Sequence, residues 1–249
     1  MHMGPVELSV SDLERSLEYW QNEIGLQILA RQDGRASLGV NRELVRLVEE
    51  PGARSARGHA GLYHVALLLP ARRDLANWLA HAGRDQVGLE GLSDHAVSEA
   101  IYLRDPDHHG IEIYADRPRE LWDGRVRELM TTMPLDVDDL LTLDDGSFDG
   151  LADGTTMGHV HLSVADVGTS AGFYRDLGFD VMAQLGDQAV FLATDGYHHH
   201  LGANTWQSRG APYAPDDRAR LTQVTIHGAP EERALRDPSG IPLQLVTAA

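Results

Sequence analysis

The sequence contains no cysteine among its 249 residues. Disulfide bonds, thiolate metal sites, iron–sulfur clusters and cysteine nucleophiles are therefore excluded. Positive charge is also scarce, because 21 Lys and Arg residues stand against 38 Asp and Glu residues and give a formal net charge of −17. Since phosphate backbones and anionic lipid surfaces are bound by positive charge, we expect neither nucleic acid nor a membrane as a partner.

Long hydrophobic runs are absent as well. No run approaches the roughly 18 consecutive apolar residues of a transmembrane helix, and the first residues, MHMGP, lack the basic and then apolar pattern of a secretion signal. These absences predict a cytoplasmic protein. Histidine, in contrast, occurs 13 times, so imidazole is the nitrogen ligand that the chain offers to a metal ion.

An alternating strand that ends in an aspartate occurs at the start of both halves of the chain. Residues 6–12 (VELSVSD) return as residues 160–166 (VHLSVAD), and an aspartate at the end of such a strand is suited to cap a following helix. Each predicted helix ends near a glycine, Gly25 or Gly178, after which a new strand begins. The two halves are therefore predicted to repeat the same order of elements.

A second repeat closes each half. The sequences RDPD at residues 104–107 and RDPS at residues 236–239 are both followed by an alternating strand, as expected after a proline-containing turn. The first half contains one more strand–helix start at residues 63–82, so it holds two units of a strand, a helix and several strands. The second half holds one full unit, at about residues 157–206, and a fourth at residues 221–249 that has lost most of its helix.

These units predict the fold class and the domain organisation. The fold is predicted to be α+β, built from tandem βαβββ modules. Residues 1–116 form an N-terminal pair of modules, and residues 156–249 form a C-terminal pair whose last module is shortened. Residues 117–155, with their prolines, glycines and acidic run, are the predicted connecting segment, with a short helix around residues 120–130.

Three groups of side chains could carry chemistry. His159 and His161 lie two residues apart on a predicted strand, so their side chains point to the same face. His64 lies on the opening strand of the second unit, Glu112 lies on its closing strand, and three consecutive histidines follow at residues 198–200. Two histidines and one carboxylate from different strands form the ligand set of a mononuclear non-haem iron(II) site. Zinc and manganese accept similar ligands, so ligand type alone leaves the metal open.

Each of these residues also has a purely structural interpretation. His64 could be a packed core histidine, Glu112 a solvated carboxylate, and the histidine run a polar loop. A common site is favoured because His64, Glu112 and His159 occupy matching positions of matching units. The counterpart of Glu112 in the fourth unit is Gln244, which carries no charge to balance a cation.

The tandem units resemble the vicinal oxygen chelate superfamily, which includes glyoxalase I, bleomycin-resistance proteins and extradiol ring-cleavage dioxygenases. Residues 95–112 place a histidine, a tyrosine, an Asp-Pro pair and a glutamate in an order similar to the extradiol dioxygenase signature. Gly158-His159 and the run at residues 197–206 resemble the CatE-type subgroup of bacterial catechol-2,3-dioxygenases. The resemblance implies modules that pair into cup-shaped mixed sheets.

The resemblance also implies an activity and site residues. The implied activity is the opening of a catechol-type aromatic diol by O2 at an Fe(II) site, with Mn(II) as an alternative metal, in a homo-oligomeric enzyme. Matching the motifs residue by residue assigns His64, Glu112 and His159 as the iron ligands. It assigns Tyr102 as the tyrosine that binds a substrate oxygen and His95 as the histidine near the substrate hydroxyl. His199 is assigned as the acid–base histidine, with His198 and His200 as alternatives for that role.

The sequence departs from the family pattern at several positions. His108 and Ser93 are off-pattern in the signature, the first unit has Pro5 where a ligand would stand, and the fourth unit has Gln244. We therefore expect the ligands to come from the second and third units, which share a cup either within one chain or between exchanged chains. A glyoxalase-type isomerase using zinc or nickel, a metal-free binding protein and an inactive member of the fold stay open as alternatives. The identity of the diol, catechol or hydroquinone, is also open.

Overall fold

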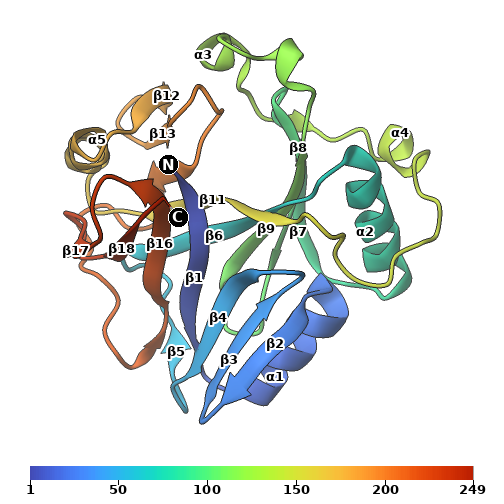
Figure 1. Cartoon of the computed structure of the whole chain (residues 1–249), viewed down its shortest axis with the longest axis horizontal. Helices are drawn as coiled ribbons and strands as arrows, with labels where there is room; N and C mark the ends of the chain where they lie inside the picture. Colours follow the sequence, from blue (N-terminus) through green and yellow to red (C-terminus); the bar gives the residue numbers. More distant parts are fainter. Residues whose placement is uncertain (249) are drawn as a thin grey trace.

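The computed structural model describes residues 1–248. Figure 1 shows two large twisted sheets, with β1 and β16 passing across β6 and β11 near the middle of the molecule and short helices at the periphery. The chain alternates strands and helices in the order that tandem βαβββ units require. The predicted α+β fold is therefore confirmed. No helix within residues 1–248 is long and apolar enough to cross a membrane.

Most of the strands belong to two sheets. In order across the seven-stranded sheet, they are β17 (Arg233–Arg236), β18 (Pro242–Thr247), β16 (Leu221–Ala229), β1 (His2–Val10), β4 (Glu43–Glu49), β3 (Arg35–Gly39) and β2 (Gln27–Gln32). In order across the nine-stranded sheet, they are β10 (Met133–Pro134), β7 (Leu89–Asp94), β8 (Ser98–Arg104), β9 (Gly110–Asp116), β6 (Gly61–Leu68), β11 (Thr156–Ser163), β14 (Leu201–Asn204), β13 (Ala189–Ala193) and β12 (Asp180–Leu185). A small third sheet joins β5 (Arg54–Ser55) to β15 (Arg218–Ala219).

The helices begin and end where the repeated sequences predicted. The side chain of Asp12 accepts a hydrogen bond from a backbone amide in the first turn of α1 (Leu13–Tyr19), and Asp166 does the same for α5 (Val167–Asp176). A π-helical turn, η1 (Trp20–Ile24), extends α1, and the chain then leaves through Gly25 at a φ of 94°. Gly178 follows α5 with a φ of 101°. The remaining helical segments are α2 (Arg72–Arg84), η2 (Arg119–Leu121), α3 (Val126–Leu129) and α4 (Val137–Leu141).

The sheets pair the modules across the chain. β1 of the first module pairs antiparallel with β16 of the fourth, and β6 of the second module pairs antiparallel with β11 of the third. The second and third modules thus share one sheet within this chain, which is the first of the two arrangements that the sequence left open. Each sheet draws strands from both residues 1–116 and residues 156–249.

The proline turns join consecutive modules. One carboxylate oxygen of Asp105 accepts hydrogen bonds from the amides two and four residues later, and its other oxygen accepts one from the indole of Trp20 in the first module. Asp237 makes the same pair of backbone contacts and accepts a hydrogen bond from the hydroxyl of Tyr174 in the third module. The two turns therefore connect the first module to the second and the third to the fourth.

The off-pattern His108 occupies a strained position of its turn. Its φ is +68°, and the equivalent residue of the second turn is Gly240 at a φ of +88°. Positive φ values favour glycine because the side chain of other residues crowds the backbone there. The turn is therefore built like its counterpart, with histidine in a position that favours glycine.

The fourth module lacks a helix, as predicted. Three residues, 230–232, join β16 to β17, and no helix occurs after α5 in the described chain. The connecting segment contains η2 and α3 in place of one helix around residues 120–130, and it also contains α4, which packs on α2.

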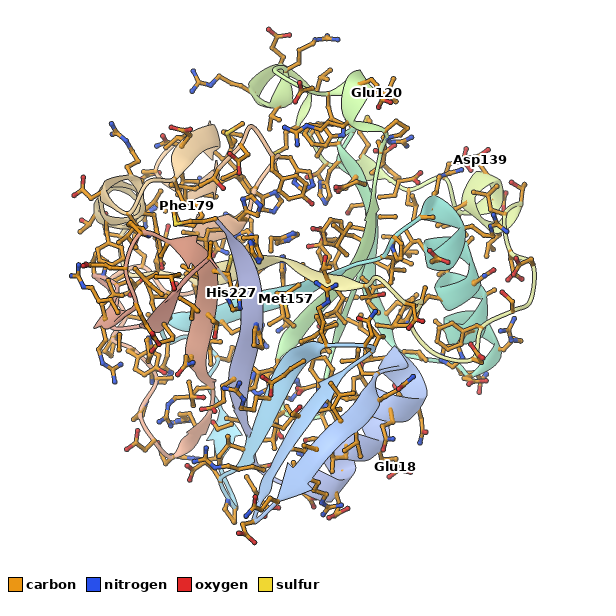
Figure 2. The ribbon with its side chains drawn as sticks, in the orientation of Figure 1. Glu18, Glu120, Asp139, Met157, Phe179 and His227 are labelled. Atoms are coloured by element: carbon orange, nitrogen blue, oxygen red, sulfur yellow. The ribbon has the colours of Figure 1, made fainter. Side chains whose placement is uncertain are left out.

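One apolar core runs through both sheets and under the helices. It contains side chains of β1 and of β11 that are inaccessible to solvent. Figure 2 shows Met157 and Phe179 inside the molecule, while Glu18, Glu120 and Asp139 project from its outer helices and turns. The central strands are thus fixed by burial, and side chains on their free faces hold defined positions.

Candidate active site

Three neighbouring strands of the nine-stranded sheet bring His64, Glu112 and His159 together. Register pairs both Glu112 on β9 and His159 on β11 with Ala66 of β6. His64 lies two residues from Ala66 on the same strand, so all three side chains project from one face. The small side chain of Ala66 leaves the space between them open.

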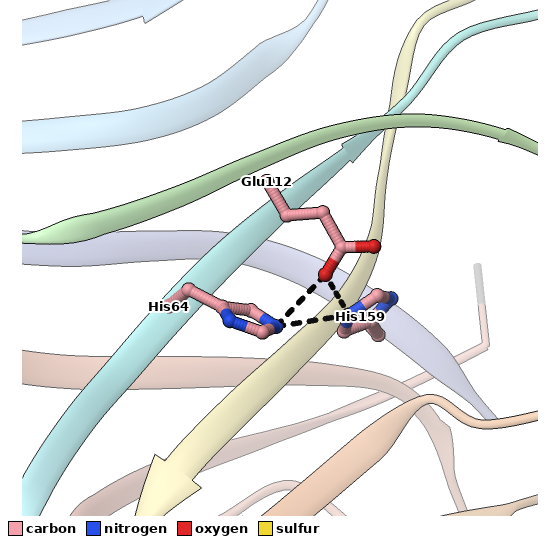
Figure 3. Close-up of side chains that lie close together, drawn as sticks. All are labelled: His64, Glu112 and His159. Atoms are coloured by element: carbon pink, nitrogen blue, oxygen red, sulfur yellow. Dashed lines mark hydrogen bonds and ion pairs between the residues drawn. The ribbon is translucent and has the colours of Figure 1, made fainter. Parts of the chain in front are cut away.

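The three side chains converge on a single point (Figure 3). The Nε2 atoms of His64 and His159 lie 3.0 and 3.1 Å from Oε2 of Glu112, and 3.2 Å from each other. All three residues are buried. Within the described residues, this is the cluster whose ligand atoms lie close enough together to hold a metal ion.

The electrostatics of the cluster favour a cation. Burial on its own raises the pKa of Glu112, but the adjacent His159 and His64 outweigh burial and hold that pKa well below its usual range. Burial lowers the pKa of His159 to about 4, although Glu112 acts in the opposite direction. Near neutral pH the cluster therefore combines a buried carboxylate with a neutral imidazole, and a buried negative charge needs a positive partner.

The donor set and its spacing fit a divalent metal ion. Ligand atoms about 2.1 Å from an ion and at right angles around it lie about 3.0 Å apart. The three observed separations of 3.0–3.2 Å match that edge length. Two imidazoles and one carboxylate on one side of the ion leave its other positions free for a substrate, as in the facial triad of non-haem iron enzymes.

The cluster lies in a cavity of about 680 Å³. His64 and Glu112 contribute to its wall, and so do all three of the residues predicted to act beside the metal, which are Tyr102, His95 and His199. The rest of the wall is largely apolar and aromatic, with Tyr63, Ile111, Met130, Leu185, Phe191 and Trp206. The wall also carries charged side chains, those of Glu90, Arg104 and Arg127.

His95 and Tyr102 form one hydrogen-bonded pair. Nδ1 of His95 lies 2.7 Å from the carbonyl oxygen of Thr131, and Nε2 lies 2.7 Å from the hydroxyl of Tyr102. Because a carbonyl only accepts, Nδ1 of His95 carries a proton, and Nε2 of a neutral His95 is then the acceptor for the hydroxyl of Tyr102. Burial and the nearby Glu112 raise the pKa of Tyr102 well above its usual range, so this residue stays a phenol.

Of the three consecutive histidines, His199 lines the cavity. Its ring packs against that of His159, with centroids 4.0 Å apart. His198 is fully buried behind it and contacts Asp116, while His200 accepts a hydrogen bond from the backbone amide of Thr194. Burial lowers the pKa of His199 well below its usual range, so the ring is neutral near pH 7. Of the three candidates for the acid–base role, His199 is therefore the one whose ring reaches the cavity.

His161 is a cavity residue that received no predicted role. It shares a face of β11 with His159, as the spacing indicated, and its ring lies among Tyr63, Phe191 and Trp206. Its Nε2 is buried without a hydrogen-bond partner among the described residues. The ring has space because its register partner on β14 is Gly202, where a Cβ atom would lie 2.8 Å from Cγ of His161.

Comparisons with known proteins agree with this geometry. Residues 2–113 match the family model of the Glyoxalase/Bleomycin resistance protein/Dioxygenase superfamily. The chain is 43% identical over 234 residues to a catechol-2,3-dioxygenase of Bacillus subtilis, covering 90% of this chain and 82% of that protein. The chain belongs to this superfamily.

Two further relatives show how widely the fold is shared within it. Glyoxalase domain-containing protein 4 of Mus musculus is 31% identical over 125 residues, which is 47% of this chain and 42% of that protein. The crystal structure of glyoxalase I from Zea mays superposes with a TM-score of 0.62 and 16% identity, over 99% of this chain and 92% of that chain. At this identity the superposition supports the fold alone, and it agrees with the predicted cup-shaped pairing of βαβββ modules.

Proposed function

We propose that the protein is an extradiol dioxygenase, which opens a catechol-type aromatic diol with O2 at an Fe(II) ion held by His64, Glu112 and His159. The observation that carries the proposal is the buried cluster of these three ligands, two of which, His64 and Glu112, line a cavity with aromatic walls. The name of the relative at 43% identity, a catechol-2,3-dioxygenase, supports the same reaction class. Mn(II) has the same ligand preference and is the alternative metal.

A bound iron(II) ion would supply the redox chemistry that links the diol to O2. The residues of the chain supply binding, orientation and proton transfer. The neutral ring of His199 can take the proton of a diol hydroxyl and return it later, as general acid–base catalysis requires. Tyr102 donates its own proton to His95, so its oxygen is left to accept a hydrogen bond from a diol hydroxyl. The apolar and aromatic side chains of the wall offer a surface on which the ring of the diol can pack.

The experiment that tests the proposal is anaerobic loading of the protein with Fe(II), followed by catechol and air, with oxygen uptake and visible absorbance recorded together. We expect a yellow ring-opened product and one O2 consumed per diol. His159→Ala should abolish both signals. Gln244→Ala is the matched control, because Gln244 is the counterpart of Glu112 in the seven-stranded sheet, and it should leave both signals unchanged.

Two results would contradict the proposal. Oxygen uptake that survives in His159→Ala would show that this histidine is not a ligand. Failure of the iron-loaded protein to consume oxygen with catechol, substituted catechols and hydroquinones would exclude the reaction class. A cytoplasmic location and a homo-oligomeric state stay predictions, and size-exclusion chromatography with light scattering tests the second.

A further inference from the structure

We propose that Asp116 and His198 are positioning residues that hold His199 in the tautomer protonated at Nδ1, so that the lone pair of Nε2 is available to the cavity. The catalytic consequence of this arrangement rests on the proposed function. The arrangement itself is a statement about three side chains and can be tested on the protein without metal or substrate.

The three side chains form a continuous hydrogen-bonded chain. Asp116 ends β9, and its Oδ1 lies 2.8 Å from Nε2 of His198. Nδ1 of His198 lies 2.8 Å from Nδ1 of His199. His198 is fully buried, whereas the Asp116 side chain keeps about a quarter of its surface exposed, at 25%. This series of hydrogen bonds therefore leads from the protein surface to the ring of His199, which lines the cavity.

The direction of each hydrogen bond follows from the groups at its ends. An ionised carboxylate only accepts, so Nε2 of His198 carries a proton and donates it to Asp116. A neutral His198 then has a lone pair at Nδ1, and Nδ1 of His199 must be the donor to it. In a neutral His199 the proton at Nδ1 leaves Nε2 unprotonated. The order of donors thus selects one of the two tautomers of His199.

Further contacts fix the outer end of this chain. The hydroxyl of Tyr197 donates to the same oxygen of Asp116, at 3.2 Å, and the hydroxyl of Tyr114 lies 2.9 Å from that of Tyr197. Since Tyr197 donates its proton to Asp116, Tyr114 donates to Tyr197. Gly158 makes room for Tyr114, because a Cβ atom at that position would lie 1.9 Å from the Tyr114 hydroxyl. Asp116 is therefore held in place by the hydroxyl of Tyr197 as well as by the ring of His198.

The inner end of the chain faces the proposed chemistry. The ring of His199 is held between His159, at 4.0 Å between centroids, and Phe191, at 5.1 Å. With Nδ1 engaged by His198, Nε2 is the ring nitrogen left for a ligand in the cavity that His199 lines. A base must present a lone pair to the proton it takes, so the opposite tautomer would present a proton there instead.

The direct test is the tautomeric state of His199, read from ¹⁵N chemical shifts of the imidazole nitrogens and their couplings to ring protons in the metal-free protein. His199→Gln assigns the signals. We expect a protonated Nδ1 and an unprotonated Nε2 in the natural sequence. A protonated Nε2 would overturn the proposal.

Two substitutions of His198 sharpen the test. His198→Phe keeps an aromatic ring but removes the acceptor for Nδ1 of His199, so we expect a protonated Nε2 to appear. His198→Asn keeps an acceptor oxygen near the position of Nδ1, and we expect it to retain the original tautomer. The matched control is His200→Asn, which keeps an acceptor for the Thr194 amide and should leave the His199 signals unchanged. An unchanged tautomer in His198→Phe would overturn the proposal.

Steady-state kinetics of the iron-loaded enzyme form a separate arm. We expect His198→Phe to lower kcat at least tenfold, with KM changed less than about threefold, and His198→Asn to recover most of kcat. Unchanged kcat in His198→Phe would show that the positioning has no catalytic consequence and would overturn that part. If no diol is oxidised by any form, the proposed function fails, while the NMR result still decides the tautomer.

Discussion

The buried ring of His161 tests whether a polar group of the cavity wall lowers the free energy of unfolding. Its side chain is 3% exposed, and its Nε2 makes no hydrogen bond within the described chain. Burying a polar group without a partner costs about 1–3 kcal/mol. We expect His161→Phe to remove this cost and to keep the ring contacts with Tyr63, Phe191 and Trp206. The free energy of unfolding should rise by about 1 kcal/mol, the low end of that range, because a larger ring must shift into the cavity away from Gly202.

Thermal and urea unfolding followed by circular dichroism measure this change. For a chain of this size, 1 kcal/mol corresponds to a rise in Tm of about 2–4 °C. The matched control is His109→Phe. His109 is similarly buried, but its Nε2 lies 2.9 Å from the carbonyl oxygen of Ser9. Losing this hydrogen bond should lower the free energy of unfolding by about 1 kcal/mol. If both substitutions shift stability in the same direction, the missing partner of His161 is not the cause, and the reasoning is refuted.

Three more predictions follow from the site and its surroundings. Divalent iron or manganese should raise the Tm of the metal-free protein, because a ligand that binds only the folded state stabilises it. Glu112→Gln should remove most of that rise. An equal rise in Tm in both proteins would exclude Glu112 as a ligand. Burial lowers the pKa of His200 to about 4, so the unfolded chain binds more protons between pH 4 and 6.5, and the free energy of unfolding should fall by up to about 3 kcal/mol as the pH is lowered through that range. Urea titrations at several pH values should show a smaller fall in His200→Asn, and an identical pH dependence would contradict the assignment. Gly158→Ala should displace Tyr114 and lower the free energy of unfolding by about 1–3 kcal/mol in the same titrations, whereas a neutral effect would show that the contact relaxes freely.

Local features of the fold could be predicted from the sequence because they depend on neighbouring residues. Asp12 and Asp166 cap their helices, and Gly25 and Gly178 end them with positive φ, as the repeated motifs indicated. The pairing of modules could not be predicted in the same way. Which strand lies beside β1 depends on burial between segments more than 200 residues apart, and no local pattern of one sequence encodes that choice.

The candidate site was predicted unevenly for a similar reason. The positions of His64, Glu112 and His159 in matching units pointed to a common cluster, and the structure places their ligand atoms within 3.2 Å of one another. Asp116 was missed because it belongs to no motif. A signal was present, since residues 112, 114 and 116 alternate on β9 and share the face of Glu112. Periodicity along a strand that already carries a ligand is therefore a useful guide to the residues behind it.

The two large sheets explain why one cup carries the site and the other does not. In the nine-stranded sheet Ala66 is in register with Glu112, and in the seven-stranded sheet Thr225 of β16 is in register with Gln244 of β18.

By this register, Gln223 stands at the position of His64, and Gln244 stands at the position of Glu112. Pro5 stands at the position of His159, because Val6 pairs with Val224 in the same way as Val160 pairs with Val65. Two uncharged amides and a proline offer no charge to a buried cation, and proline offers no ligand atom on its side chain. The same backbone thus holds a candidate metal-binding triad in one pair of modules and no such triad in the other. The difference lies in these three side chains, so the candidate metal site is a property of residues placed on the fold and not of the fold itself.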